Sequence, residues 1–197
     1  MERTNHPRAP VLACRILWLA LWSLAANGQP RAIDTTRSTM TIRVYKTGVL
    51  SVLGHDHEIS APVARGTVDV PGHTVELHIE TGTLRVRDPK ASDKDRQEIQ
   101  TTMLGPEVLD ERNYKQIDFQ STGAEGSGTG VWKVTGKLTL HGMTRPVSVE
   151  VREKDGHFAG ACQLKITDFG IKPVKAAGGS ISVKDEVRIE FDIELAR

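Results

Sequence analysis

The stretch VRIEFDIEL at residues 187–195 decides the fold class of this 197-residue chain. Apolar and charged side chains alternate through it without interruption. Because successive side chains of a β-strand point to opposite faces, the segment has one apolar face and one charged face. It therefore predicts a strand of an antiparallel sheet, with one face on a core and the other in water.

The same period of two recurs over most of the chain. Turn residues such as Pro71, Gly72 and Gly156 separate the runs, and the glycine-rich residues 123–130 are expected to form a hairpin loop. About eight or nine short strands at regular spacing, without helices alternating between them, predict an all-β sandwich or barrel. The clear runs lie at 40–45, 75–80, 132–140 and 147–152, and the weaker ones at 49–60, 64–70, 116–122 and 157–166.

One mid-chain segment departs from this period. Residues 92–104 begin with a serine that can cap a helix, and the apolar residues Ile99 and Met103 fall on one helical face. The dipeptide at 105–106, Gly-Pro, ends the pattern. One short helix is therefore expected in this connection, with a second helical turn near 108–112.

Residues 1–28 have the order of a secretory signal peptide. A segment with three arginines precedes an apolar run at 16–26, which is too short to span a bilayer, and small residues follow as far as Gly28. We expect cleavage after Gly28 and a periplasmic or secreted protein, with a short membrane anchor as the alternative. Residues 29–37 are expected to form a flexible lead-in, and 38–196 to form the β-barrel domain.

Charge and cysteine content argue against a nucleic-acid-binding surface and against an internal disulfide. Loss of residues 1–28 removes three Arg and one Glu, which leaves 23 basic and 24 acidic side chains and a net charge of −1. The two signs are mixed along the chain, so no basic surface for nucleic acid is expected. Cys162 is then the only cysteine, which excludes an internal disulfide and favours a small buried apolar side chain.

A histidine-rich motif leaves two alternatives open. His55 and His57 flank Asp56 and would share one side of a strand, and His141 is a further candidate. Zinc requires three or four such ligands, so a polar rim or structural corner is favoured over a metal site. The chain has no Gly-x-Ser-x-Gly elbow and no evident Cys/His pair, so neither an enzyme nor a cofactor is predicted.

Five blocks in a fixed order carry a family resemblance: GHDH at 54–57, IDFQS at 117–121, GKLTLHGMTRPV at 136–147, ITDFGI at 166–171 and VKDEV at 183–187. Together they resemble the YceI-like lipid/polyisoprenoid-binding family. The resemblance implies an eight-stranded antiparallel lipocalin-like barrel with one or two short helices in a mid-chain connection. It also implies export to the periplasm and a polyisoprenoid or similar lipid held inside the barrel.

On this interpretation the apolar strand faces line a lipid site. The alternatives are a metal-assisted enzyme that uses the His-x-His motif at the rim, and a packed barrel without ligand. An apolar lipid is the expected partner, and the oligomeric state, including a homodimer, stays open. The expected lining residues are Met40, Ile42, Val44, Val75, Leu77, Ile79, Phe119, Trp132, Val134, Leu138, Phe158, Leu164, Ile189, Phe191 and Ile193.

Overall fold

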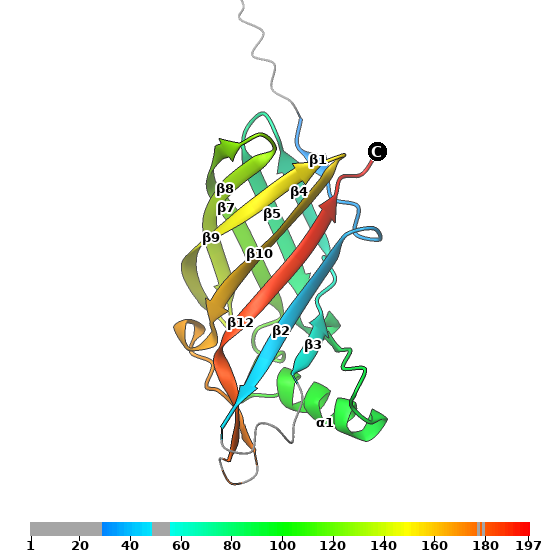
Figure 1. The fold of residues 1–197 in the computed structure, drawn as a ribbon, viewed down its shortest axis with the longest axis vertical. Helices are drawn as coiled ribbons and strands as arrows, with labels where there is room; N and C mark the ends of the chain where they lie inside the picture. The colour runs from blue at the N-terminus through cyan, green and yellow to red at the C-terminus, as the bar shows by residue number, and fades with distance from the viewer. Residues whose placement is uncertain (1–28, 49–55, 177, 179) are drawn as a thin grey trace, which may run out of the picture.

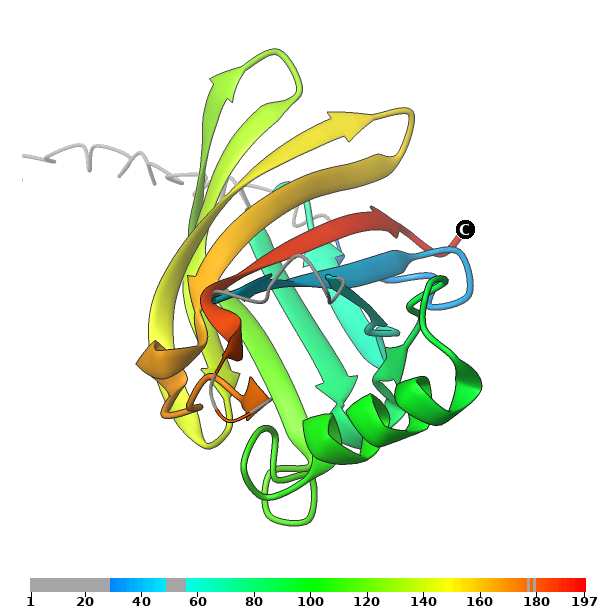
Figure 2. The same cartoon turned by 60° about the horizontal axis from the view of Figure 1, so that its bottom comes forward.

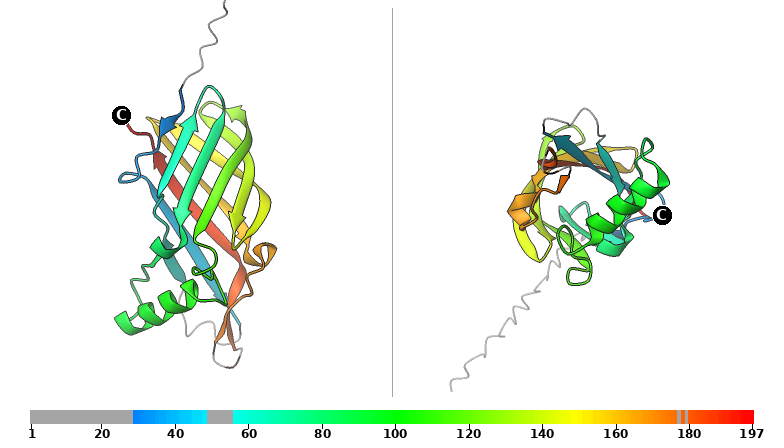
Figure 3. Two further views of the ribbon diagram at one scale, coloured as in Figure 1. Left: turned by 180° about the vertical axis from the view of Figure 1, so that it is seen from behind. Right: turned by 90° about the horizontal axis from the view of Figure 1, so that it is seen from below.

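The computed structural model describes residues 29–48, 56–176, 178 and 180–197. Within these residues the strands form one antiparallel sheet that curls around a central space, and a helix lies at one end (Figures 1 and 3). The predicted all-β antiparallel class is therefore confirmed. The predicted signal peptide at 1–28 lies outside the described residues.

The described sheet has twelve strands. Their order is β1-β4-β5-β7-β8-β9-β10-β12-β2-β3-β6, and β11 pairs with β12 beside this path. Two short 3₁₀ turns lie at Thr81–Thr83 and Ile166–Phe169. The elements are β1 Arg31–Ala32, β2 Thr39–Thr47, β3 His57–Ser60, β4 Arg65–Asp69, β5 Thr74–Glu80, β6 Arg85–Val86, α1 Asp93–Leu104, β7 Gln116–Gly128, β8 Val131–Leu140, β9 Met143–Lys154, β10 His157–Lys165, β11 Lys175–Ala176 and β12 Ile181–Glu194.

The sheet closes on itself where the first and last described segments meet. Ile33, just beyond β1, forms an antiparallel bridge with Leu195. The amide of Asp34 donates to the carbonyl of Glu194 at 2.9 Å. Ile33 is only 6% exposed and belongs to an apolar cluster, so residues 29–37 are not a flexible lead-in from Arg31 onward. The polar composition of this segment led to the prediction of flexibility, although the side chain of Ile33 anchors it to the sheet.

The expected count of eight strands is not confirmed. β3 and β4 follow each other closely, with Pro62 between them, and proline has no N–H to donate to a neighbouring strand. On one side of Pro62 the amide of Ala61 donates to Met40, and on the other side that of Ala64 donates to His78, both at 2.9 Å. The chain thus passes from one neighbouring strand to another. The strands β1, β6 and β11 have two residues each, too few to show a period.

Cross-strand pairing fixes which side chains face inward. Ile189 on β12 pairs with Ile42 on β2. The intervening Arg43 points outward, where its guanidinium donates to Glu58 and Glu190 at 2.9 Å each. Hydrogen bonds from Arg188 and then Arg43 hold the pKa of Glu190 below its usual value. The apolar side chains of β2 and β12 therefore face inward and the charged ones outward, as the alternation predicts.

Helix α1 forms where the sequence predicts it. It starts at Asp93 and ends at Leu104, and the hydroxyl of Ser92 accepts from the amide of Asp95 at 3.2 Å. Figure 2 shows the helix lying across one end of the sheet. The second expected helical turn, at 108–112, is a series of turns instead. Among the described residues, none of the helices could span a bilayer.

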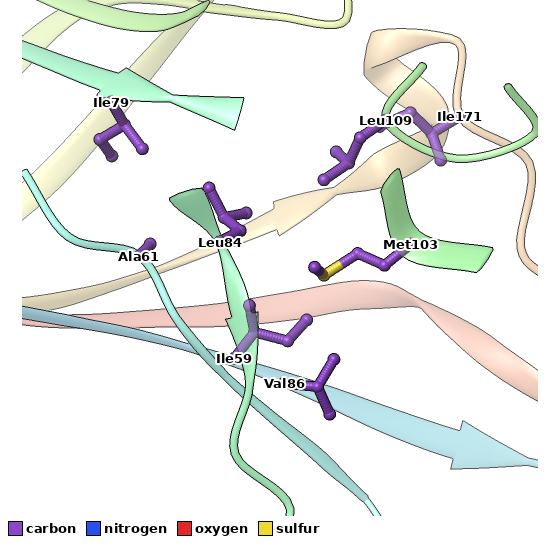
Figure 4. Packing of buried hydrophobic residues seen from close by; sticks show 8 residues of the cluster. All are labelled: Ile59, Ala61, Ile79, Leu84, Val86, Met103, Leu109 and Ile171. Atoms are coloured by element: carbon purple, nitrogen blue, oxygen red, sulfur yellow. The ribbon is translucent and has the colours of Figure 1, made fainter. Parts of the chain in front are cut away.

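The helix end of the barrel is packed with side chains. Met103 of α1 joins a buried cluster drawn from β3, β5, β6 and the loops near them (Figure 4). Ile99, on the same helical face, packs against it. The eight buried members are Ile59, Ala61, Ile79, Leu84, Val86, Met103, Leu109 and Ile171.

The glycine-rich tract at 123–130 was expected to be a hairpin loop, and this expectation is wrong for most of it. Strand β7 continues to Gly128, and only Thr129 and Gly130 form the turn to β8. Two register shifts interrupt the pairing, one between Ser121 and Gly123 and one near Gly128. Such bulges bend a strand and increase its twist, and glycines often mark them.

Two inner glycines face phenylalanine rings from neighbouring strands. A methyl group at Gly136 would lie 2.5 Å from the ring of Phe119 and 2.6 Å from the carbonyl oxygen of Gln120. At Gly160 it would lie 2.7 Å from the ring of Phe191. These strands approach closely because glycine leaves the space that each ring occupies.

We predict that Gly136→Ala lowers the free energy of unfolding by about 1–3 kcal/mol, because the added methyl on β8 overpacks against the Phe119 ring of β7. Gly123→Ala on the neighbouring strand is the matched control, since its methyl would meet nothing closer than 3.5 Å. Urea unfolding of both variants measures the difference. Equal stability of the two would contradict this description of the wall.

Candidate functional site

The barrel encloses a cavity of about 630 Å³. Its walls are almost entirely aliphatic and aromatic side chains from the inner faces of the strands. Small-molecule sites are typically concave, mostly apolar and ~300–1,000 Å³ in volume. The cavity therefore has the size and chemistry of a site for one apolar ligand.

All fifteen residues predicted from strand alternation line this cavity, although lipid binding by them stays a prediction. They come from β2, β5, β7, β8, β10 and β12, so the lining surrounds the space. The residues are Met40, Ile42, Val44, Val75, Leu77, Ile79, Phe119, Trp132, Val134, Leu138, Phe158, Leu164, Ile189, Phe191 and Ile193.

Two further contributions to the lining come from outside those strands. Ile99 and Met103 of α1, with Val108 and Leu109 after it, line the cavity at the end we call the helix end. The sequence predicted the apolar face of this helix, but the end of the barrel that it covers depends on contacts between distant segments. β6 pairs with β3, and α1 packs beside β6.

Trp132 lies at the opposite end, which we call the Trp132 end. Its indole N–H donates to a carboxylate oxygen of Glu153 at 3.3 Å. The imidazole ring of His73 lies 5.1 Å from the Trp132 ring, centre to centre. All three residues line the cavity. The role of His73 was missed, because a histidine in a surface turn gives no sequence signal for a contact with a distant strand.

Charged groups at the ends of inner strand faces were also missed. On β2 the inner row Met40, Ile42 and Val44 continues to Lys46, and Lys46 lines the cavity. On β9 the inner row of valines ends in Glu153. The sequence contained the information, because Lys46 and Glu153 each lie two residues beyond the last apolar residue of an inward-facing row.

The polar rim expected from the His-x-His motif is only partly described. His55 lies outside the described residues. A carboxylate oxygen of Asp56 accepts from the backbone amide of Lys46 at 3.2 Å. Nδ1 of His57 lies 2.6 Å from Oδ2 of Asp88, whose other oxygen accepts from the amide of Glu58 at 2.5 Å. Asp88 is 1% exposed, and its carboxylate holds β3 to the chain that follows β6.

His141 has different neighbours from His57. It occupies the turn between β8 and β9, and its Nδ1 lies 3.2 Å from the carbonyl oxygen of Phe169. The ring of Tyr114 packs edge-on against it at 4.5 Å. Among the residues that the structure describes, no three His, Cys, Asp or Glu side chains form a group that could hold a metal ion.

Cys162 lines the cavity from β10, opposite Ile189 of β12. Burial raises the pKa of its thiol, and the nearby charge of Arg188 acts in the other direction. The thiol is therefore a poor nucleophile at neutral pH, because the thiolate is the reactive form. Its position makes it a chemical reporter of access to the cavity.

A curled antiparallel sheet around an apolar interior defines the class of β-barrel proteins, whose interiors either fill with side chains or hold a ligand. Residues 32–195 match the YceI-like domain, and the chain belongs to the YceI-like family. The family predicted from the sequence blocks is thus confirmed.

Relatives and solved structures agree with this assignment. A UPF0312 protein of Vibrio cholerae is 25% identical over 179 residues, which cover 84% of this chain and 88% of the relative. A UPF0312 protein of Vibrio parahaemolyticus is 27% identical over 180 residues, covering 85% and 89%. The crystal structure of Burkholderia cenocepacia BcnA is similar with a TM-score of 0.60 at 17% identity, covering 84% of this chain and 99% of that one. At that identity the similarity concerns the fold.

We predict that Cys162 reacts with a maleimide at least about tenfold more slowly in the folded protein than in urea, because it faces the cavity and its thiol pKa is raised. The test uses a Cys14→Ser chain, so that Cys162 is the only thiol. A matched control carries Cys162→Ser and Gln163→Cys, which moves the thiol to the exposed outer face. Equal folded-state rates for the two positions would mean that β10 is placed with the wrong face inward.

Proposed function

We propose that this protein is an exported binding protein that holds a long-chain polyisoprenoid or a similar apolar lipid inside its barrel, in a carrier, storage or stress-related role. The observation that carries the proposal is the continuous apolar lining of a cavity of about 630 Å³. Membership of the YceI-like family supports a binding role.

The energetics favour a chain-like apolar ligand. Each buried CH₂ group contributes about 0.8 kcal/mol, and ordering the chain and removing it from a membrane offset much of this gain. The inner wall supplies Met, Ile, Val and Leu side chains in nearly every row, with few polar groups to orient a small polar substrate. A flexible hydrocarbon suits such a surface better than a compact polar molecule does.

The two alternatives have less support. A packed barrel without ligand does not account for an interior space of this size. A metal-assisted enzyme would need His57 and His141 at one ion, whereas His57 lies against Asp88 and His141 against Phe169. We therefore propose a non-enzymatic role without a cofactor, and the order of charged, apolar and small residues in 1–28 supports export.

We predict that Val149→Trp lowers the lipid content of the purified protein several-fold, because the indole fills cavity volume from an inner position on β9. Ser148→Trp is the matched control, since the adjacent side chain is on the exposed outer face. Organic extraction followed by mass spectrometry measures lipid, and metal analysis of the same sample tests the enzyme alternative. No extractable lipid in the unmodified protein, or stoichiometric zinc lost with His57→Ala, would count against the proposal.

A separate prediction concerns export. Protein recovered from the cell envelope should begin near Gln29, because the small residues that end at Gly28 suit signal peptidase. N-terminal sequencing or intact-mass measurement checks this start. Envelope protein that retains Met1 would show that residues 1–28 act as an anchor instead.

A further inference from the structure

The charged residue at the helix end of β2 faces into the cavity. Lys46 continues the inner row of Met40, Ile42 and Val44, and it is half-buried. Lysine can lay its methylene stem along an apolar wall and keep its ammonium at the edge of the apolar region. The stem of Lys46 thus extends the hydrocarbon lining, and its charge marks where that lining ends.

A second lysine reaches the same end from a different part of the chain. Lys46 pairs with Val183 of β12, whose amide donates to the carbonyl of Val174 at 3.0 Å. Lys172 precedes Val174 by two residues, and all four side chains line the cavity. Among the described residues neither lysine ammonium has an ion-pair partner. Two positive charges therefore border one end of the apolar interior.

Acidic groups near this end do not cancel those charges. Glu98 of α1 also lines the cavity, but its side chain is 67% exposed and lies 3.9 Å from the ammonium of Lys94. The carboxylate of Asp88 is 1% exposed and is engaged by His57 and a backbone amide. The carboxylate of Asp56 accepts from the amide of Lys46 but, like Asp88, does not line the cavity. Lys46 and Lys172 therefore outnumber Glu98 among the charged lining residues at the helix end, and the lining there is net positive.

The charged residues that line the Trp132 end are acidic. Strand pairing through β10 and β12 makes β9 antiparallel to β2, so the inner row of β9 ends at the other end of the barrel. That row ends in Glu153, whose carboxylate lines the cavity beside Trp132. Asp69 also borders this end, with its carboxylate accepting from the amide of Gly72. An anionic group placed here would meet charge of the same sign.

We propose that the ligand is an amphiphile with a single long apolar chain and an anionic head group, a carboxylate or a phosphate. Lys46 and Lys172 bind the head group at the helix end, and the chain runs along the cavity towards Trp132. Charge-assisted hydrogen bonds from ammonium groups to such oxyanions are stronger than neutral ones. This inference rests on the proposed function, because it names the class of lipid that the same cavity takes.

A head-group series tests the proposal without any change to the binding residues. Palmitate, hexadecyl phosphate, hexadecanol and hexadecylamine share one chain and differ in charge. Trp132 emission reports binding in a Trp18→Phe, Trp22→Phe chain, where Trp132 is the only tryptophan. We expect the two anions to bind roughly tenfold more tightly than the alcohol, and the amine most weakly, with the advantage reduced by added salt.

The outcomes distinguish a failure of the anionic head group from a failure of lipid binding itself. Equal affinity for anion and alcohol overturns the anionic head group and leaves lipid binding intact. Failure of all four compounds to bind, together with the absence of extractable lipid, overturns the proposed function as well. The tighter of the two anions identifies the head group as carboxylate or phosphate.

Variants and labelled ligands test the orientation. Lys46→Met and Lys172→Met should each weaken palmitate binding roughly five- to tenfold and leave hexadecanol unchanged, whereas the exposed Lys137→Met on β8 should change neither. Palmitate brominated at its terminal carbon should quench Trp132 more strongly than palmitate brominated beside the carboxylate. Equal losses for the alcohol and palmitate, or the reverse order of quenching, would overturn the placement of the head group at the helix end.

Discussion

The constraint on which the rest of this structure depends is that its one sheet has no second layer. The long strands carry an apolar face, and the only α-helix among the described residues covers just one end. The sheet must therefore bury its apolar face against itself, and curling is the only arrangement that does so. Closure follows from hydrogen bonds between residues 32–34 and 194–196.

A sheet that curls this way does not fill its interior evenly. At the helix end, Leu84 and Ile171 are each 2% exposed and the apolar cluster is close-packed. Further along, the wall is thin where glycines oppose phenylalanine rings, as at Gly136 and Gly160. The aliphatic side chains of the remaining rows do not reach across the space. The result is an apolar cavity with lysine side chains at the helix end and Glu153 at the Trp132 end.

The sequence predicted the parts of this molecule that depend on neighbouring residues. Alternation over β2, β5, β8, β9 and β12 places inner and outer side chains correctly because one residue fixes the face of the next. The cap of α1 is likewise local, since Ser92 and Asp95 are three residues apart. The family blocks supplied the barrel and its interior, which alternation alone left open between a sandwich and a barrel.

Contacts between segments that are distant in the sequence could not be predicted from local sequence patterns. Asp88 lies 31 residues from His57, and nothing near either residue indicates their pairing. Ile33 is an apolar side chain in a polar segment, and its partners include Val63 and Val68 as well as Ile193 and Leu195 near the other end of the chain. His73 meets Trp132 only because the β4–β5 and β7–β8 hairpins end at the same rim. Each of these contacts can be identified only once the three-dimensional fold is known.

The meeting of the two chain ends has a practical consequence for orientation. The guanidinium of Arg31 donates to the carbonyl of Ala196 at 2.8 Å, at the end of the barrel where β9 and β12 also finish. A tether attached before Gln29 or after Arg197 therefore leaves from the Trp132 end. Protein immobilised on a sensor, or fused to a surface display partner, presents its helix end outward to the solution. The end of the barrel that carries Lys46 and Lys172 then faces the solution.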